Sequence, residues 1–270
     1  MKTAFVTTLD DRFVPGFRVA LNSLLRTTQN FNYDIIIIEW GNLSKQNKDS
    51  INTLYSKIFY HTINEQSYSQ SIFDKQHREW TYNCNFRFDV FTLAQYEQVV
   101  FFDSDIVFRT CLQSLLQEKI DFGAVPRPPG QILQIEQPHG FDAGLMVIGK
   151  KYLNPQVKLD LIEISQDQAP YDNRVNSRLW VGNEPILNNY FANKVTWLPL
   201  KYNLCTDAVT PDLLREQYNI QYIGKKKPWC CKDLDDQFDP YIIEAIGNKN
   251  GKYLTRILLK KLITIYQENL

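Results

Sequence analysis

Two aspartates follow an apolar stretch in the segment Phe101-Phe102-Asp103-Ser104-Asp105. Residues i and i+2 of an extended chain point to the same side, so Asp103 and Asp105 can face one point in space. Paired carboxylates are hard oxygen donors that suit Mg²⁺ or Mn²⁺, whereas a zinc site would require His or Cys. A cation bound there could hold a diphosphate. The same pair could also lie in a solvated turn, because so short a motif often matches by chance.

The composition is that of a soluble globular protein, with 270 residues of which 44% are hydrophobic. Thirty basic residues balance thirty acidic ones, so we expect no nucleic-acid partner. The odd number of cysteines, without CxxC spacing, predicts free thiols in a reducing compartment. We see no apolar leader and no run that reaches the roughly 20 residues of a membrane span, so a cytoplasmic protein is expected.

Strand-like and helix-like stretches alternate along the first half of the chain. Apolar runs predict strands over residues 4–8, 33–40 and 99–102, and amphipathic periodicity predicts helices over residues 17–25, 51–57 and 85–96. This alternation favours an α/β fold with a mostly parallel central sheet flanked by helices. Ligands of such sheets bind beyond the carboxyl ends of the strands, and Asp103 lies at such an end.

The second half of the chain continues the pattern. Apolar runs predict strands over residues 122–125, 145–148 and 195–198, and residues 126–130 form a loop by composition. A helix is predicted over residues 185–190, with Asn183 as its N-cap and Pro185 in its first turn. We find no internal repeat and no linker, so a single domain over residues 1–250 is expected.

The tail of the chain, residues 251–270, is predicted to be an amphipathic helix. Its apolar residues on one face are Leu254, Ile257, Leu258, Leu262 and Ile265. Such a helix could dock on the domain, pair with a second copy in a homodimer, or lie on an anionic membrane. Because few basic residues accompany it, we expect docking rather than membrane contact.

Six short segments follow one another in a fixed order between Ala4 and Trp229. They are Ala4-Phe5-Val6-Thr7-Thr8 with Asp11 and Phe13, Asn85-Phe86-Arg87-Phe88-Asp89, Phe102-Asp103-Ser104-Asp105, Phe141-Asp142-Ala143-Gly144, Leu198-Pro199-Leu200-Lys201-Tyr202-Asn203 and Gly224-Lys225-Lys226-Lys227-Pro228-Trp229. In order and spacing they resemble the motifs of glycosyltransferase family 8, the glycogenin-like retaining enzymes. Each segment alone is a weak signal, but the set is specific.

The resemblance implies a GT-A fold, with residues 1–250 as a single catalytic domain. It also implies a UDP-sugar donor, Mn²⁺ or Mg²⁺, and transfer with retention of anomeric configuration. By position, Asp103 and Asp105 would hold the metal, while Arg87 and Asp142 would contact the donor sugar. The residues implied to bind the UDP-sugar are Thr7, Thr8, Leu9, Phe13, Arg87, Ser104, Gly224 and Lys227.

Three positions depart from the pattern that the resemblance implies. Gln221 stands where the family usually has a histidine as third metal ligand, and we expect its amide oxygen to bind the cation instead. The usual Asp-Gln pair becomes Asn183-Glu184, and Asp142 stands where asparagine is more common. These changes bear on metal affinity and donor choice more than on the fold.

Glu184 adds a carboxylate where the resemblance implies a glutamine near the donor sugar. Below the anomeric carbon it could act as the nucleophile of a double displacement. It could equally stabilise positive charge during a front-side transfer, or merely suit the N-terminal end of a helix. We expect Glu184 to line the donor site and to form the catalytic set with Asp142 and Arg87.

The leading hypothesis is a metal-dependent enzyme that moves a hexose (glucose, galactose or N-acetylglucosamine) from a UDP-sugar to a carbohydrate, protein or lipid-linked acceptor. The alternative is a catalytically weak or inactive nucleotide-sugar-binding protein, because Gln221 could weaken the metal site. A dehydrogenase is disfavoured, since no GxGxxG follows the first strand. The aspartate pair alone would also suit a phosphatase or a nuclease, but the segments at residues 141–144 and 224–229 argue against both.

Overall fold

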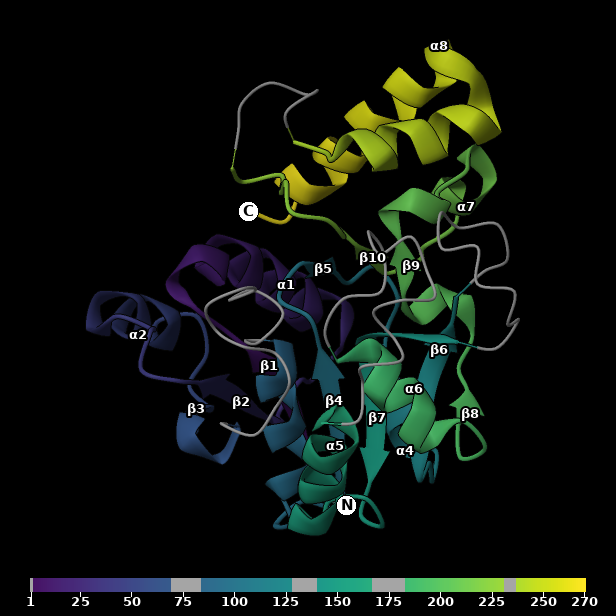
Figure 1. The fold of residues 1–270 in the computed structure, drawn as a ribbon. Coiled ribbons are helices and arrows are strands. Elements are labelled where there is room, and N and C mark those ends of the chain that lie inside the picture. Colours follow the sequence, from purple (N-terminus) through teal and green to yellow (C-terminus); the bar gives the residue numbers. More distant parts are fainter. Residues whose placement is uncertain (1, 69–83, 128–139, 167–182, 231–236) are drawn as a thin grey trace.

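A seven-stranded sheet runs through the middle of the protein in the order β3-β2-β1-β4-β7-β6-β8 (Figure 1). The computed structural model describes residues 2–68, 84–127, 140–166, 183–230 and 237–270. The strands of this sheet are β1 Thr3–Thr8, β2 Asp34–Glu39, β3 Ile58–Thr62, β4 Gln98–Phe102, β6 Phe122–Pro126, β7 Phe141–Gly149 and β8 Thr196–Trp197. Neighbouring strands from β3 to β4 are parallel, whereas β7 is antiparallel to both of its neighbours. The mostly parallel α/β sheet predicted from the sequence is confirmed.

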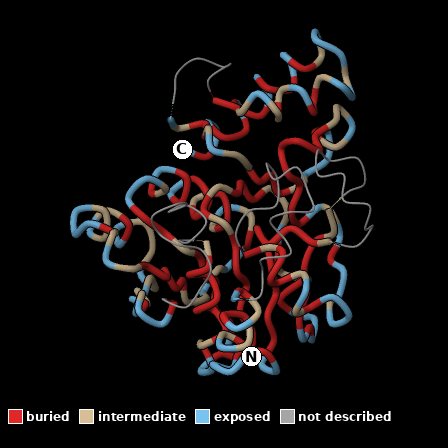
Figure 2. The backbone as a smooth tube through the Cα atoms, viewed as in Figure 1, coloured by how far each residue is buried: buried red, intermediate tan, exposed pale blue. Residues whose placement is uncertain are grey.

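Helices cover both faces of this sheet. They are α1 Val14–Thr27, α2 Lys45–Asn52, α4 Gln113–Gln117, α5 Pro155–Gln166 and α6 Glu184–Phe191, with the 3-10 helices η1 Asp11–Phe13, η2 Glu65–Tyr68 and η3 Asn85–Thr92. Side chains of α1, α2 and α4 form one buried cluster with the sheet, and side chains of η3, α5 and α6 form the other. Successive residues of β2 enter different clusters, since Ile36 and Ile38 face the η3 side while Ile35 and Ile37 face α1. The sheet is therefore buried on both faces (Figure 2), which is why its strands are continuous apolar runs.

A second sheet, of three strands in the order β5-β10-β9, packs against the C-terminal helix of the chain (Figure 1). Its elements and neighbours are β5 Ile106–Val107, η4 Leu200–Tyr202, β9 Leu204–Cys205, η5 Thr206–Ala208, α7 Pro211–Arg215, β10 Ile220–Gln221 and α8 Pro240–Gln267. Buried residues of α8 pack with β9 and β10 in a third cluster, so this helix docks on the domain as expected. Gly251, with φ of +73°, interrupts the helical backbone of α8. No helix in the described part of the chain combines the length and the apolar character that a bilayer crossing requires.

Several local predictions were wrong, each for a physical reason. The predicted helix over residues 51–57 is the end of α2 followed by a turn, and the edge strand β3 was missed because its side chains are only half buried. The predicted α-helix over residues 85–96 is the 3-10 helix η3, whose first seven residues are all buried, so amphipathic periodicity does not describe it. Ile257 is 43% exposed and lies off the buried face of α8. Residues 128–130 of the predicted loop lie outside the described residues.

Candidate active site

A cleft of about 820 Å³ opens beyond the carboxyl ends of β1 and β4, at the edge where β7 begins. Its lining includes most of the residues singled out in the sequence, namely Thr8, Phe13, Arg87, Asp103, Ser104, Asp105, Asp142, Glu184, Gln221, Gly224 and Lys227. Thr7 and Leu9 do not line it. Both are buried, and the Leu9 backbone N–H already donates to the Ile38 carbonyl at 3.0 Å.

The first of the two aspartates, Asp103, is held on both of its carboxylate oxygens. Arg87 Nη2 donates to Oδ1 at 3.0 Å, and Gln221 Nε2 donates to Oδ2 at 2.9 Å. The Asp103 backbone N–H donates to the Gly144 carbonyl at 2.8 Å, which ties the turn after β4 to β7. Burial raises the pKa of Asp103 to about 7, against the opposing effect of Arg87.

The second aspartate, Asp105, is only half satisfied. Its Oδ2 accepts a hydrogen bond from Lys227 Nζ, which also donates to the Tyr222 carbonyl at 2.6 Å. Its Oδ1 is buried and has no hydrogen-bond partner among the described residues. A buried carboxylate oxygen without a donor is costly, so Asp105 has a free coordination position in an otherwise bonded turn.

Lys227 reaches this position because its loop is fixed at both ends. Gly224 has φ of +93°, and a Cβ there would lie 2.2 Å from Asp239 Oδ2, so this position requires glycine. Asp239 also accepts backbone hydrogen bonds from the two residues after Gly224. At the other end, Trp229 Nε1 donates to the Arg12 carbonyl at 3.2 Å. The Gly-Lys-Lys-Lys-Pro-Trp segment is thus a fixed loop that turns one buried lysine toward Asp105.

Arg127 joins two further acids at the other end of the cleft. Its Nη2 lies 3.0 Å from Asp142 Oδ2 and 2.6 Å from Glu184 Oε2. The second oxygen of Glu184 accepts from the Ala143 backbone N–H at 3.2 Å. Burial raises the pKa of Glu184, and Arg127 opposes that effect. Arg127 was not predicted from the sequence, where it lies at the start of a proline-rich stretch.

The start of β7 and the start of α6 bring these acids together. The register of β7 against β6 shifts, so that Val125 pairs with Asp142 directly after Ala124 pairs with Met146. Such a bulge frees the backbone around Ala143, which can then face the cleft. On α6, the Asn188 amide exchanges two hydrogen bonds with the Phe141 backbone, at 2.8 and 3.0 Å. Glu184, the first residue of α6, is therefore held beside Asp142.

Gln221 and Asn203 connect the two ends of the cleft. Asn203 Nδ2 donates to Asp142 Oδ1 and to Gln221 Oε1, both at 3.0 Å. The Gln221 oxygen therefore faces Asn203 and its nitrogen faces Asp103. A Cβ at residue 144 would lie 2.1 Å from that oxygen, so Gly144 leaves room for the amide. To serve as a metal ligand, the Gln221 amide would have to turn over.

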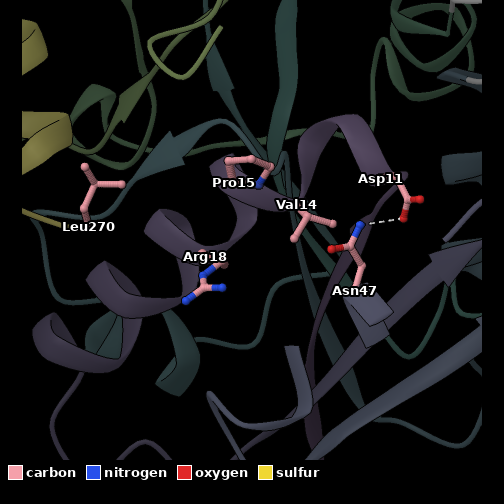
Figure 3. Close-up of a pocket in the computed structure, with 6 residues that line it drawn as sticks. All are labelled: Asp11, Val14, Pro15, Arg18, Asn47 and Leu270. Carbon is pink, nitrogen blue, oxygen red and sulfur yellow. Dashed lines mark hydrogen bonds between the residues drawn. The ribbon is translucent and has the colours of Figure 1, made fainter. Parts of the chain in front are cut away.

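A smaller pocket of about 450 Å³, whose lining shares no residue with the cleft, lies between α1 and α2 (Figure 3). Asp11 Oδ1 accepts hydrogen bonds there from Asn47 Nδ2 and the Ser44 backbone N–H, each at 2.8 Å. Asp11 thus connects the start of α1 to the start of α2.

The capping role predicted for Asn183 is absent, because its side chain makes no capping hydrogen bond to α6 and donates to the Cys84 carbonyl instead.

The sequence as a whole matches the profile of glycosyl transferase family 8 over residues 5–232. The chain belongs to this family. Among solved structures it is similar to the galactosyltransferase LgtC in complex with donor and acceptor sugar analogues, at 18% identity and a TM-score of 0.66, over 91% of this chain and 95% of that one. An active-site glutamine-to-glutamate mutant of LgtC is also similar, at 17% identity and a TM-score of 0.67, over 91% and 95% of the two chains.

GlyE of Streptococcus pneumoniae TIGR4 is similar at 16% identity and a TM-score of 0.63, over 96% of this chain and 63% of that one. At such identities these likenesses establish the fold, which is the GT-A fold expected from the sequence. Among curated protein sequences, none matches the chain.

Enzymes of family 8 generally use a divalent cation and a nucleotide-sugar donor. Within the described residues of this family 8 glycosyltransferase, no three His, Cys, Asp or Glu side chains gather as a metal-ligand cluster. The oxygen ligands expected from the sequence are instead two aspartates and the amide of Gln221, whose oxygen faces Asn203. The unpartnered Oδ1 of Asp105 fits a hard cation, because Mg²⁺ and Mn²⁺ prefer carboxylate oxygens and keep several waters.

Several other residues of the cleft were missed in the sequence. Asp10 caps η1 by accepting from the Arg12 and Phe13 backbone N–H groups, at 2.9 and 3.2 Å, and it pairs with the Arg12 side chain. Trp40 lies with its ring centroid 5.0 Å from that of Phe86. The pattern Asp-x-x-Phe before a helix was an available capping signal for Asp10. The sequence carries no comparable local signal for Trp40.

Proposed function

We propose that the protein is a divalent-cation-dependent, retaining glycosyltransferase that moves a hexose (glucose, galactose or N-acetylglucosamine) from a UDP-sugar to a carbohydrate, protein or lipid-linked acceptor. The observation that carries this proposal is the cleft in which Asp103, Asp105 and Lys227 meet at one end and Asp142 and Glu184 at the other. LgtC, which has the same fold, was solved with both donor and acceptor sugar analogues.

The end with Asp103 and Asp105 would bind the diphosphate. Asp105 offers an unpartnered oxygen and Asp103 a second carboxylate, so these two residues would hold the cation. Bound there, a divalent ion would neutralise charge that develops on the leaving UDP. Lys227, which donates to Asp105 in the free protein, would donate to a phosphate oxygen instead when the nucleotide binds. Gly224 and Ser104 would contribute to the same subsite, while Thr8 and the Phe13 ring would seat the base.

The end with Glu184 would receive the sugar. Arg87 contacts both Asp103 and the Ala143 carbonyl, so it lies between the two ends and would orient the sugar next to the diphosphate. Negative charge on Glu184 and Asp142 would lower the energy of an oxocarbenium-like transition state. Glu184 stands where the resemblance implies a glutamine, which is the type of exchange that the LgtC active-site mutant carries.

The test is UDP release from a panel of UDP-sugars with Mn²⁺, Mg²⁺ or chelator, beside an Asp103→Asn/Asp105→Asn control. We expect release from one donor, abolished by chelator and by the double variant. Absence of any cation-dependent UDP binding would contradict the family-type site.

The alternative, a binding protein without turnover, is favoured by the Gln221 nitrogen that faces Asp103. It predicts tight, cation-dependent UDP binding without sugar release in the presence of any donor or acceptor.

A further inference from the structure

Glu184 and Asp142, the two acids at positions where the resemblance implies amides, share one guanidinium nitrogen. Arg127 Nη2 contacts both, at 2.6 and 3.0 Å, from a side chain that is only 15% exposed. Two carboxylates this close would repel each other in a poorly solvated site, and a cation between them removes that cost. An amide pair would need no such cation. The three residues therefore form one ion-paired unit, in which a single positive charge offsets one of two negative charges.

We propose that Arg127 is a positioning residue for sugar transfer: it holds Glu184 and Asp142 as one rigid unit, in which Glu184 acts through its charge and not as a nucleophile. This inference rests on the function proposed above. Arg127 does not itself need to touch the reacting atoms. It acts through the two carboxylates.

Both oxygens of Glu184 are already engaged, which argues against nucleophilic attack. Oε2 accepts from Arg127 and Oε1 accepts from the Ala143 backbone N–H at 3.2 Å. A nucleophile must direct a lone pair at the anomeric carbon, and two donors on its oxygens reduce its reactivity. A fixed negative charge needs no such freedom, and it stabilises positive charge best when it is preorganised.

The partner acid is equally constrained. Asp142 accepts from the Gly144 backbone N–H at 2.7 Å and from Asn203 Nδ2 at 3.0 Å, in addition to Arg127. Asn203 also donates to Gln221, and Gln221 donates to Asp103. Arg87 donates both to Asp103 and to the Ala143 carbonyl. A closed ring of hydrogen bonds thus surrounds the place where the sugar would bind. Arg127 is the member of that ring that joins Glu184 to Asp142.

Arg127→Met tests this role, and Lys158→Met is the matched control. Lys158 also neutralises a buried acid, with Nζ 3.0 Å from Asp89, but neither residue lines the cleft. We expect both variants to lower Tm by roughly 5–10 °C. Arg127→Met alone should lower kcat by about 100-fold, while the Kd for UDP with Mn²⁺ changes less than about threefold. Arg127→Lys should recover part of kcat, since it restores the positive charge but not the planar guanidinium that holds one nitrogen between the two acids.

Three results would overturn the proposal. The first is wild-type kcat in Arg127→Met, and the second is a loss of kcat no larger than that of Lys158→Met. The third is a glycosyl adduct on Glu184, detected by mass spectrometry of enzyme quenched during turnover.

A thermal double-mutant cycle of Arg127→Met and Glu184→Gln needs no turnover. We expect the two Tm losses to be strongly non-additive, because each change removes the same ion pair. Additive losses would contradict the unit even in an inactive protein. Failure of wild-type enzyme to release UDP from any donor would instead count against the proposed function alone.

Discussion

The two ends of the cleft each hold a pair of carboxylates, yet basic side chains offset the negative charge to different extents. At the sugar end one guanidinium, that of Arg127, serves both Asp142 and Glu184. At the diphosphate end Asp103 and Asp105 have separate cations, brought by η3 and by the loop after β10. One oxygen of Asp105 still lacks a partner among the described residues. All four carboxylate oxygens of the sugar end thus have partners without a ligand, so we call it the complete end, although Arg127 Nε has none among the described residues. The diphosphate end, with one unpartnered carboxylate oxygen, is the incomplete end and has a place for a ligand.

The largest expected effect comes from removing the acids of the incomplete end. Asp103→Asn/Asp105→Asn should lower UDP-sugar turnover by at least about 10³-fold, because the charge on the leaving group is then not neutralised. The same variant should lose the rise in Tm that Mn²⁺ with UDP gives the wild type. Differential scanning fluorimetry and a UDP-release assay measure both effects. A ligand-induced rise in Tm that survives in this variant would mean that another part of the cleft binds the nucleotide.

A change of charge at the complete end should act on turnover and not on binding. Glu184→Gln should lower kcat by about 10²-fold and leave the Kd for UDP with Mn²⁺ within about threefold of wild type. The residue keeps its size, and Arg127 keeps its pair with Asp142. Steady-state kinetics beside isothermal titration would separate the two constants. Wild-type turnover would show that the charge at residue 184 has no role in the reaction.

Lys227→Met should have the opposite profile to Glu184→Gln. It removes the ammonium group that would bind the diphosphate, so the Kd for UDP should rise about 10-fold. Binding of Mn²⁺ in the absence of nucleotide should become tighter, because the positive charge at Asp105 Oδ2 is removed. Titration followed by Mn²⁺ electron paramagnetic resonance measures the free ion directly. Unchanged or weaker Mn²⁺ binding would mean that the Lys227 contact does not compete with the cation.

The smallest effect concerns Asp207, a buried acid that lines the cleft near Arg127. Burial raises its pKa to about 6, against opposing effects of Arg127 and Lys249. Its folded-state pKa therefore exceeds the unfolded value, so the wild type loses stability as pH rises from 4 through 6. Relative to Asp207→Asn, we expect a loss of about 1–3 kcal/mol over that range and a plateau above pH 7. Parallel stability profiles from urea unfolding at each pH would show that Asp207 is ionised throughout.

The sequence predicted one end of the cleft better than the other. Asp103, Asp105 and Lys227 lie in local motifs, and the strand before the aspartates is a continuous apolar run, so both types of signal are short-range. Arg127 has no local signal. Its role depends on the bulge in β7 and on the docking of α6, which join residues separated by 57 positions in the chain.

Gln221, expected from the sequence as third metal ligand, shows the same limit. Gln221 lines the cleft, but the direction of its amide depends on Asn203, which in turn donates to Asp142. No pattern around residue 221 carries that information.

Apolar runs in the sequence indicate buried strands, so they predicted the strands in the middle of the sheet. They missed β3 because the side chains of this edge strand are only partly buried.

A diphosphate in the cleft would compete with Asp105 for the Lys227 ammonium group, which in the free protein donates to Asp105 Oδ2 and to the Tyr222 carbonyl. In the free protein its ammonium group is bonded to Asp105 Oδ2, and its positive charge opposes a cation at the unpartnered Oδ1. Neither the ion nor the nucleotide alone therefore gains the full set of contacts. An ion at Asp105 would free Lys227 for the phosphates, and the phosphates would free Asp105 for the ion. By thermodynamic reciprocity each ligand must strengthen the other by the same factor. On the proposed function, the loop after β10 therefore makes the enzyme a coincidence detector, which responds to the metal–nucleotide complex and little to either component alone.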